Sequence, residues 1–87
     1  MKIREGFVLR EIAGEYVVIA LGSASQIFNG MIKLNESGAL IWKKLCDGSD
    51  REELIAALLE QYDANRATVE ADVERVLDLL KGAKILE

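Results

Sequence analysis

The stretch FVLREIAGEYVVIAL, residues 7 to 21, decides the fold of the front of the chain. It contains two runs rich in β-branched and aromatic residues, Phe7–Ile12 and Tyr16–Leu21, and such runs favour extended strands. The segment between them, Ala13-Gly14-Glu15, is short and has a glycine at its centre, and glycine accepts the positive φ angles that tight turns need. The stretch therefore predicts an antiparallel β-hairpin.

A third strand is predicted after the hairpin. Gly22–Ser25 is typical of a loop, and the segment Phe28–Leu34 then resembles a strand. Within it Ile32 and Leu34 share one parity and would face the core, whereas Lys33 would point to the opposite face. We expect this strand to form an edge of the sheet, where backbone amides and carbonyls are free to pair with another strand.

Two helices are predicted after the third strand. Asn35 is a suitable N-cap for the first, because its side chain can accept from amides of the first turn. Asp47-Gly48 ends that helix, and Ser49 and Glu52 have the spacing of a capping box for the second. Asp63-Ala64-Asn65 is predicted to end the second helix.

The third helix is predicted from about Arg66 to Lys81, and Gly82 ends it. One face of this helix is apolar and consists of Val69, Val73, Val76, Leu77 and Leu80. We expect most of these side chains to face the core and one or two of them to line a cleft. Ile85-Leu86 is expected to return as a short terminal strand. The order βββααα predicts an α+β fold of winged-helix type, in one domain spanning residues 1–87.

Composition narrows the chemistry. The 87 residues include no histidine and one cysteine, so neither a common metal-ligand set nor the usual general base is present, and no cofactor is expected. We expect Cys46 to be a small buried side chain, and we expect no catalysis. There is no apparent signal peptide and no apolar run near the roughly 20 residues that cross a bilayer, which favours the cytoplasm and no membrane contact.

The charge pattern disfavours nucleic acid as the main ligand. The net charge is −4, whereas proteins that bind nucleic acid gain most of their affinity by neutralising phosphates with lysine and arginine. In the third helix the three basic residues are outnumbered by Glu70, Asp72, Glu74 and Asp78. A winged-helix DNA-binding regulator is therefore the second-ranked hypothesis, and an enzyme or metal protein is the third.

Several segments in sequence resemble one known family. They are Leu34–Trp42, Asp47–Leu54, Leu59–Asp63 and Val69–Val73. Together they are similar to the pyrroloquinoline quinone (PQQ) synthesis protein D family, the PqqD-like proteins, over about Gly6 to Leu86. No single motif carries the resemblance, which rests on the order and length of the elements.

The resemblance implies a function. Members of that family act as recognition elements for ribosomally made, post-translationally modified peptides (RiPPs). Such a peptide chaperone binds the leader of a precursor peptide and presents it to a modifying enzyme, of radical S-adenosylmethionine (SAM) type in PQQ biosynthesis. The leader pairs as an added strand with the third strand, beside the third helix. The resemblance thus implies as partners a precursor peptide and a radical SAM or other modifying enzyme. The exposed edges of the sheet permit either a monomer or a weak, strand-exchanged dimer.

This mechanism predicts a peptide-binding edge and a helix beside it. The candidate residues on the edge are Asn29, Gly30, Met31, Ile32, Lys33 and Leu34, and those on the helix are Val69, Asp72, Val73, Arg75 and Val76. Glycine at position 30 would permit close backbone approach, and no proline removes a donor from the edge. Asp72, Arg75 and Asp78 would form the rim. The same edge could instead be purely structural and guarded by Lys33, as natural edge strands often are.

Overall fold

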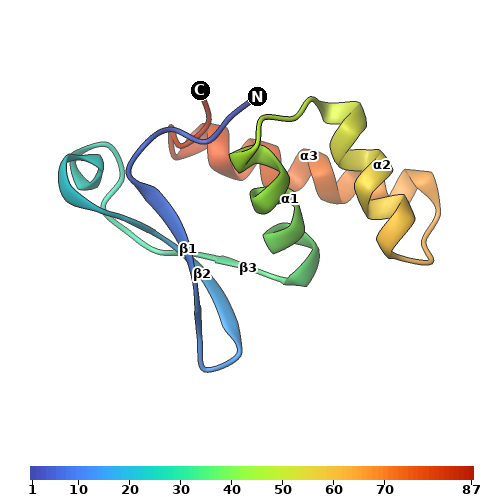
Figure 1. Cartoon of the computed structure of the whole chain (residues 1–87), viewed down its shortest axis with the longest axis horizontal. Coiled ribbons are helices and arrows are strands. Elements are labelled where there is room, and N and C mark those ends of the chain that lie inside the picture. The colour runs from blue at the N-terminus through green and yellow to red at the C-terminus, as the bar shows by residue number, and fades with distance from the viewer.

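The computed structural model describes residues 1–87 and has the predicted order of three strands and three α-helices (Figure 1). The sheet is antiparallel, with strand order β1-β2-β3. The strands are β1 (Phe7–Ile12), β2 (Glu15–Ala20) and β3 (Ile32–Leu34). The helices are the 3₁₀ helix η1 (Gly22–Gln26), α1 (Glu36–Cys46), α2 (Arg51–Gln61) and α3 (Arg66–Gly82). The predicted α+β fold is confirmed.

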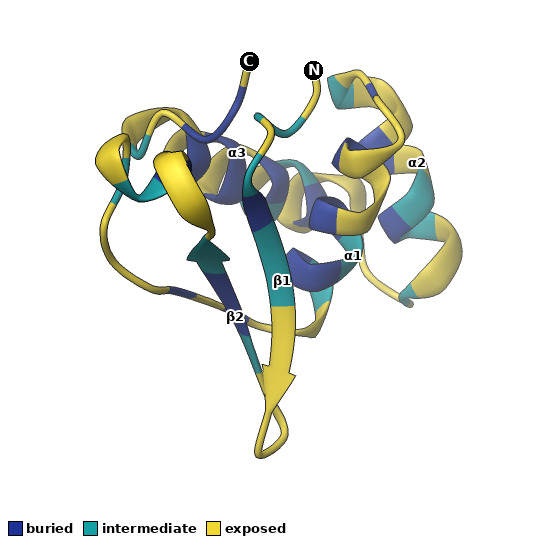
Figure 2. Ribbon diagram, turned by 60° about the vertical axis from the view of Figure 1, so that its left-hand side comes forward, coloured by how far each residue is buried: buried dark blue, intermediate teal, exposed yellow.

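The hairpin closes through two residues rather than the predicted three. Ala13 and Gly14 have φ angles of 53° and 80°, which is the pattern of a two-residue turn with both central residues in the left-handed region. Ile12 and Glu15 therefore face each other, and β2 begins one residue earlier than predicted. The hairpin tip projects away from the helices and is exposed (Figures 1 and 2).

The core lies where the sheet meets the helices (Figure 2). Trp42 is 3% exposed, as expected for an anchor of this core. The predicted apolar face of α3 is buried throughout, and its members are Val69, Val73, Val76, Leu77 and Leu80. Burial of this face, at roughly 1.5–3 kcal/mol for each large apolar side chain, fixes the rotation of α3 about its axis. The opposite side of α3 therefore determines what the helix presents at the surface.

The third strand is shorter than predicted. Only Ile32–Leu34 pairs with β2, through the partners Val18, Val17 and Tyr16, whereas residues 28–31 form a loop. The alternation predicted within the strand is confirmed, because Ile32 and Leu34 are buried and Lys33 is exposed. Upstream of it, Gly22–Gln26 is a 3₁₀ helix where a loop was expected.

The N-cap of α2 is one residue later than predicted. Asp50 accepts from Glu53 N at 2.8 Å, and Glu53 Oε1 accepts from Asp50 N at 3.0 Å, which makes these two residues the capping box. Ser49 instead donates its hydroxyl to Lys44 O at 3.0 Å, and its amide donates to Met1 O. The prediction that Ser49 and Glu52 form the box is wrong.

The two ends of the chain lie side by side (Figure 1). The predicted terminal strand is a single antiparallel bridge between Ile3 and Leu86, supported by a hydrogen bond from Arg4 N to Ile85 O at 2.7 Å. A second bond, from Glu87 N to Lys2 O, closes the pair. No helix is both long enough and apolar enough to span a membrane.

Candidate functional site

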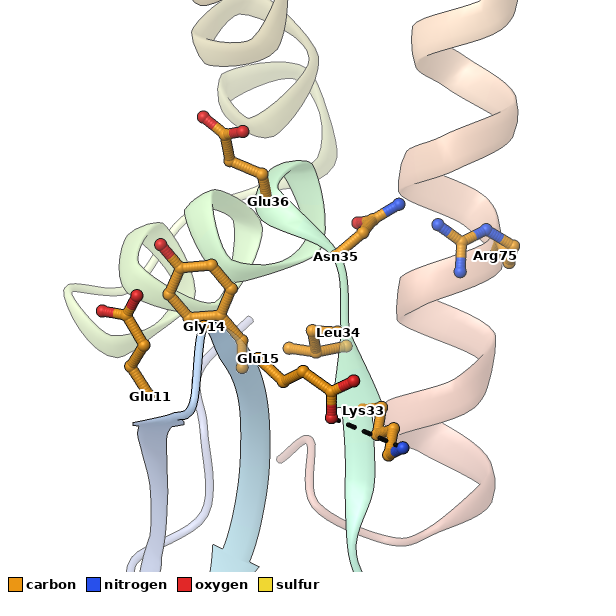
Figure 3. A pocket seen from close by; sticks show the side chains of 9 residues that line it. Glu11, Gly14, Glu15, Lys33, Leu34, Asn35, Glu36 and Arg75 are labelled. Carbon is orange, nitrogen blue, oxygen red and sulfur yellow. Dashed lines mark ion pairs between the residues drawn. The ribbon is translucent and has the colours of Figure 1, made fainter.

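Two open clefts adjoin β3, and Lys33 lines both of them. One, of about 620 Å³, lies between residues 28–33 and the C-terminal end of α3. The other, of about 640 Å³, lies between the hairpin tip, the end of β3 and Arg75 of α3 (Figure 3). Because the clefts share Lys33, we treat them as one feature, the β3–α3 groove.

The wall of this groove on α3 is a single helix face. Arg75, Asp78, Leu79 and Gly82 line it, and their spacing of three, four and seven residues places them on one side of a helix. This face lies next to the buried one, so burial of the apolar face turns these four residues toward β3. Gly82 contributes open space, because a Cβ at this position would meet nothing within 4 Å.

The backbone of β3 presents free groups to the groove, and the hairpin register shows which. In the β1–β2 hairpin Ile12 faces Glu15 next to the turn, and at the other end Leu21 N donates to Gly6 O. Every second residue pair between these ends therefore exchanges hydrogen bonds, beginning with Ile12 and Glu15. The even-numbered residues of β2, Tyr16 and Val18, therefore point their amides and carbonyls at β3. The amides and carbonyls of their partners Leu34 and Ile32 therefore form hydrogen bonds within the sheet, whereas Lys33 directs its N–H and C=O toward the open edge.

One end of the groove is apolar. Met31 and Leu79 are 66% and 41% exposed, which is unusual for large apolar side chains. The Phe28 ring lines the same end, and a Cβ on Gly30 would come within 3.1 Å of that ring. Glycine at position 30 thus gives room to Phe28, which is a different reason from the close ligand approach that the sequence suggested.

The other end of the groove is polar. Glu11, Glu15 and Glu36 line it together with Lys33 and Arg75 (Figure 3). The Lys33 ammonium lies 3.5 Å from the Glu15 carboxylate, and both side chains are largely exposed. Such an exposed pair contributes about 0–1 kcal/mol, so the lysine is free to exchange partners.

Arg75 extends from α3 toward Asn35 across the polar end in Figure 3. Its only ion pair is a long one, 3.9 Å to Asp72, so its guanidinium retains donors for a ligand carboxylate or carbonyl. Of the residues predicted on α3, Arg75 therefore lies on the groove, with Asp72 one turn beyond it.

The three valines of α3 that were predicted to contact the peptide do not line the β3–α3 groove. Val73 and Val76 are 0% and 1% exposed, so they support the groove from the core and do not form its surface. Val69 lines a neighbouring cleft of about 410 Å³, which it shares with Asp72 and Tyr62. In that cleft burial, followed by the nearby Glu36 carboxylate and then Tyr16, raises the pKa of the Tyr62 phenol.

Sequence reasoning did not propose as binding candidates several residues that line the groove. They are Phe28, Asp78, Leu79, Gly82 and Ala83 at the apolar end and Glu11, Gly14, Glu15, Tyr16, Asn35 and Glu36 at the polar end. Asp78 was expected only at the rim. The signal that could have found the residues of α3 among them is the spacing of Arg75, Asp78, Leu79 and Gly82, which repeats at helical intervals on the side next to the buried stripe. No group of three histidine, cysteine, aspartate or glutamate side chains is placed to hold a metal ion.

Comparison with solved structures gives two strong matches. The chain is 31% identical to the protein in a structure described as TbiB1 in complex with the TbiA(beta) leader peptide. That match has a TM-score of 0.78 and covers 100% of this chain and 95% of the other. The second is lasso peptide synthetase B1 complexed with the leader peptide, at 22% identity and a TM-score of 0.71, covering 93% and 89% of the two chains. At that identity the second match shows the fold alone.

Comparison with curated proteins gives no match. A family model does match, over residues 15–86, which is most of the chain and includes β2, β3 and all three helices. Its description is coenzyme PQQ synthesis protein D, and the resemblance found in the sequence is confirmed. The chain belongs to the PqqD family.

Proposed function

We propose that this chain is a non-catalytic module of the cytoplasm that binds the leader of a ribosomally made precursor peptide as an added strand on β3. It presents that peptide to a modifying enzyme of radical SAM or another type. The observation that carries the proposal is the outward N–H and C=O of Lys33, on a strand edge that borders a groove. The family and the 31% identical protein described with a leader peptide support it.

The groove explains how a leader would be selected. Backbone pairing with an edge strand supplies affinity with little demand on sequence, and pockets for alternate side chains supply selectivity. An extended peptide beside β3 directs every second side chain toward α3. The apolar end, at Met31 and Leu79, suits a large apolar side chain of the leader, and the polar end suits a side chain that can pair with Lys33 or Arg75.

The test removes one backbone donor. Lys33→Pro deletes an N–H that points away from β2, so the sheet keeps its ladder while the added strand loses a partner. We expect the affinity for the leader of the cognate precursor peptide to fall by about tenfold or more, in isothermal titration calorimetry.

The matched control is Lys33→Ala, which removes the same side chain and keeps the N–H. It should bind within about threefold of the parent chain, because the ion pair with Glu15 is exposed. A folded Lys33→Pro variant that binds the leader as the parent does would exclude strand addition at β3.

DNA binding remains the second hypothesis, and the ion pairs of α3 weigh against it. Arg66 lies 2.7 Å from Glu52 and 3.6 Å from Glu70, and Arg75 pairs with Asp72. These contacts place carboxylates beside two of the three basic residues of the helix that would enter the major groove, which weakens the attraction of that helix for phosphate. Tight, salt-sensitive retention of duplex DNA on a filter would reverse this ranking.

A further inference from the structure

The sheet has a second free edge, on β1, and it also borders a groove. This β1–α1 groove, of about 420 Å³, is lined mainly by Val8, Leu9 and Arg10 of the strand and by Trp42, Lys43 and Cys46 of the helix. No strand pairs with this side of β1, which is six residues long against three for β3. An uncovered edge of this length is a template for another strand.

The register shows which backbone groups this edge offers. The even-numbered residues of β1 exchange hydrogen bonds with β2, as the bond from Leu21 N to Gly6 O shows at its end. Phe7, Leu9 and Glu11 therefore direct their amides and carbonyls outward. An added strand would find three successive pairs of donors and acceptors, whereas β3 offers one such pair within its paired length.

The charge of the β1–α1 groove differs from that of the rest of the surface clefts. Its lining has two cations, Arg10 and Lys43, and no acidic residue, although the chain as a whole has a net charge of −4. Neither cation forms an ion pair, so both are available to an acidic ligand. Lys33, Arg51, Arg66 and Arg75 form ion pairs, and the other basic residues, like these two, form none. Complementarity therefore selects an acidic occupant. A second copy of this chain would place two basic grooves against each other, which is unfavourable.

We propose that the β1–α1 groove docks an extended, acidic segment of a second protein, which adds to β1 as a strand. Side chains on one face of that segment would contact Leu9 and Trp42 beside Lys43, and those on the other face would lie on the side of Arg10, because consecutive residues of a strand point to opposite faces. Acidic side chains would pair with these two cations. We identify that second protein as the modifying enzyme, and this identification rests on the function proposed above. Leader and enzyme would then extend the same sheet from opposite edges, about 19 Å apart, since neighbouring strands lie about 4.8 Å apart.

Cys46 allows a direct test, because it is the only cysteine of the chain, is exposed and lines the groove. The probes are two blocked synthetic peptides, TVEVEVT and TVKVKVT, which differ at two positions, where the side chains carry opposite charges. We expect the acidic peptide at saturation to slow alkylation of Cys46 by about fivefold or more and to shift the amide signals of Leu9 and Glu11. The basic peptide should do neither.

Variants test whether Arg10 and Lys43 cause the preference for an acidic peptide. Reversing both cations, with Arg10→Glu and Lys43→Glu, should exchange the preference, so that the basic peptide protects Cys46 and the acidic one does not. Lys81→Glu, a cation outside the groove and without an ion pair, is the matched control and should behave as the parent. Equal protection by both peptides, protection by neither, or an unchanged preference in the reversed variant would overturn the proposal.

Two further results distinguish docking of the enzyme at β1 from self-association of this chain and from leader binding at β3. Protection of Cys46 that grows with the concentration of this chain alone would show that a second copy occupies the groove, and would overturn the proposal. Leader binding is followed separately, at the Lys33 amide, so failure at that edge contradicts the function proposed above and leaves the result at β1 standing. Shifts from the acidic peptide confined to residues 31–34 would exclude docking at β1.

Discussion

The two edges of the sheet offer different surfaces to a partner. β3 is short, lies beside α3, and borders a groove with an apolar end at Met31 and a polar end where acidic side chains outnumber basic ones. β1 is twice as long, lies beside α1, and borders a groove whose charges are Arg10 and Lys43 alone. On the two proposals above, a single small sheet would distinguish two extended partners by charge and by length of pairing.

The difference also shows what controls access to an edge. In both strands the hydrogen-bond register, not the exposure of a side chain, decides which amides are free. Lys33 on β3 and Leu9 on β1 carry free backbone groups, whereas Ile32 and Val8 use theirs in the sheet. Substitutions with proline at neighbouring positions should consequently have opposite effects on folding and on binding.

The largest effect is expected from Ile32→Pro. This substitution removes a donor that pairs with Val18 and truncates a side chain that is 7% exposed, so the free energy of unfolding should fall by about 3 kcal/mol or more. Lys33→Pro should cost less than about 1 kcal/mol, because its N–H faces outward. Urea unfolding followed by the fluorescence of Trp42, the only tryptophan, measures both. Equal losses would show that the assigned register is wrong.

A smaller effect is expected from filling the apolar end of the β3–α3 groove. Gly82→Leu places a side chain where nothing lies within 4 Å, so leader affinity should fall by about tenfold, near 1.4 kcal/mol, in calorimetry. Stability should hold or rise, because leucine favours a helix more than glycine does. Lys81→Leu, the adjacent position outside the groove, is the control. Full affinity in Gly82→Leu would remove this end from the binding site.

The smallest effect concerns the reactivity of the β1 edge. Partial desolvation by the surrounding protein, and after it the Asp47 carboxylate, raises the pKa of the exposed Cys46 thiol. Asp47→Asn should therefore lower that pKa and shift the pH profile of Cys46 alkylation to lower pH, since the thiolate is the reactive form. Asp63→Asn, which does not act on Cys46, should leave the profile in place.

The same pKa sets a pH dependence of stability. A thiol whose pKa is higher in the folded chain binds its proton more tightly there. It therefore stabilises the fold fully below the unfolded pKa of about 8.5, and the stabilisation is lost as the pH rises through the folded pKa. Asp47→Asn should reduce this alkaline loss, measured by urea unfolding at a series of pH values. A larger loss in the variant would contradict the stated cause.

The helices could be predicted from the sequence because their signals are local. Asn35 and Asn65 each accept from the amide three residues later, at 2.8 Å, as N-caps do. The start of α2 is ambiguous by the same logic, since Ser49 and Asp50 each precede a glutamate by three residues. Contacts distant in sequence decided between them, because the Ser49 amide is used by Met1 O.

The site was harder to predict because burial depends on what lies opposite. Val73 and Leu79 both belong to α3, yet only the packing of α2 and α1 against that helix shows that the first is core and the second faces the groove. Cys46 was expected to be a small buried side chain, but it is exposed because α1 ends there beside the open edge of β1. The prediction of a buried Cys46 is wrong for this reason.

The pairing of the two chain ends has a consequence for engineering. Ile3 and Leu86 form a bridge at the end of the molecule opposite the hairpin tip, and the polar end of the β3–α3 groove lies at that tip (Figure 1). Because joining neighbouring termini is generally tolerated, a circularly permuted chain with new ends in the loop between α2 and α3 should retain the sheet. Such a permutant would allow a tether to be attached at a chosen distance from either edge.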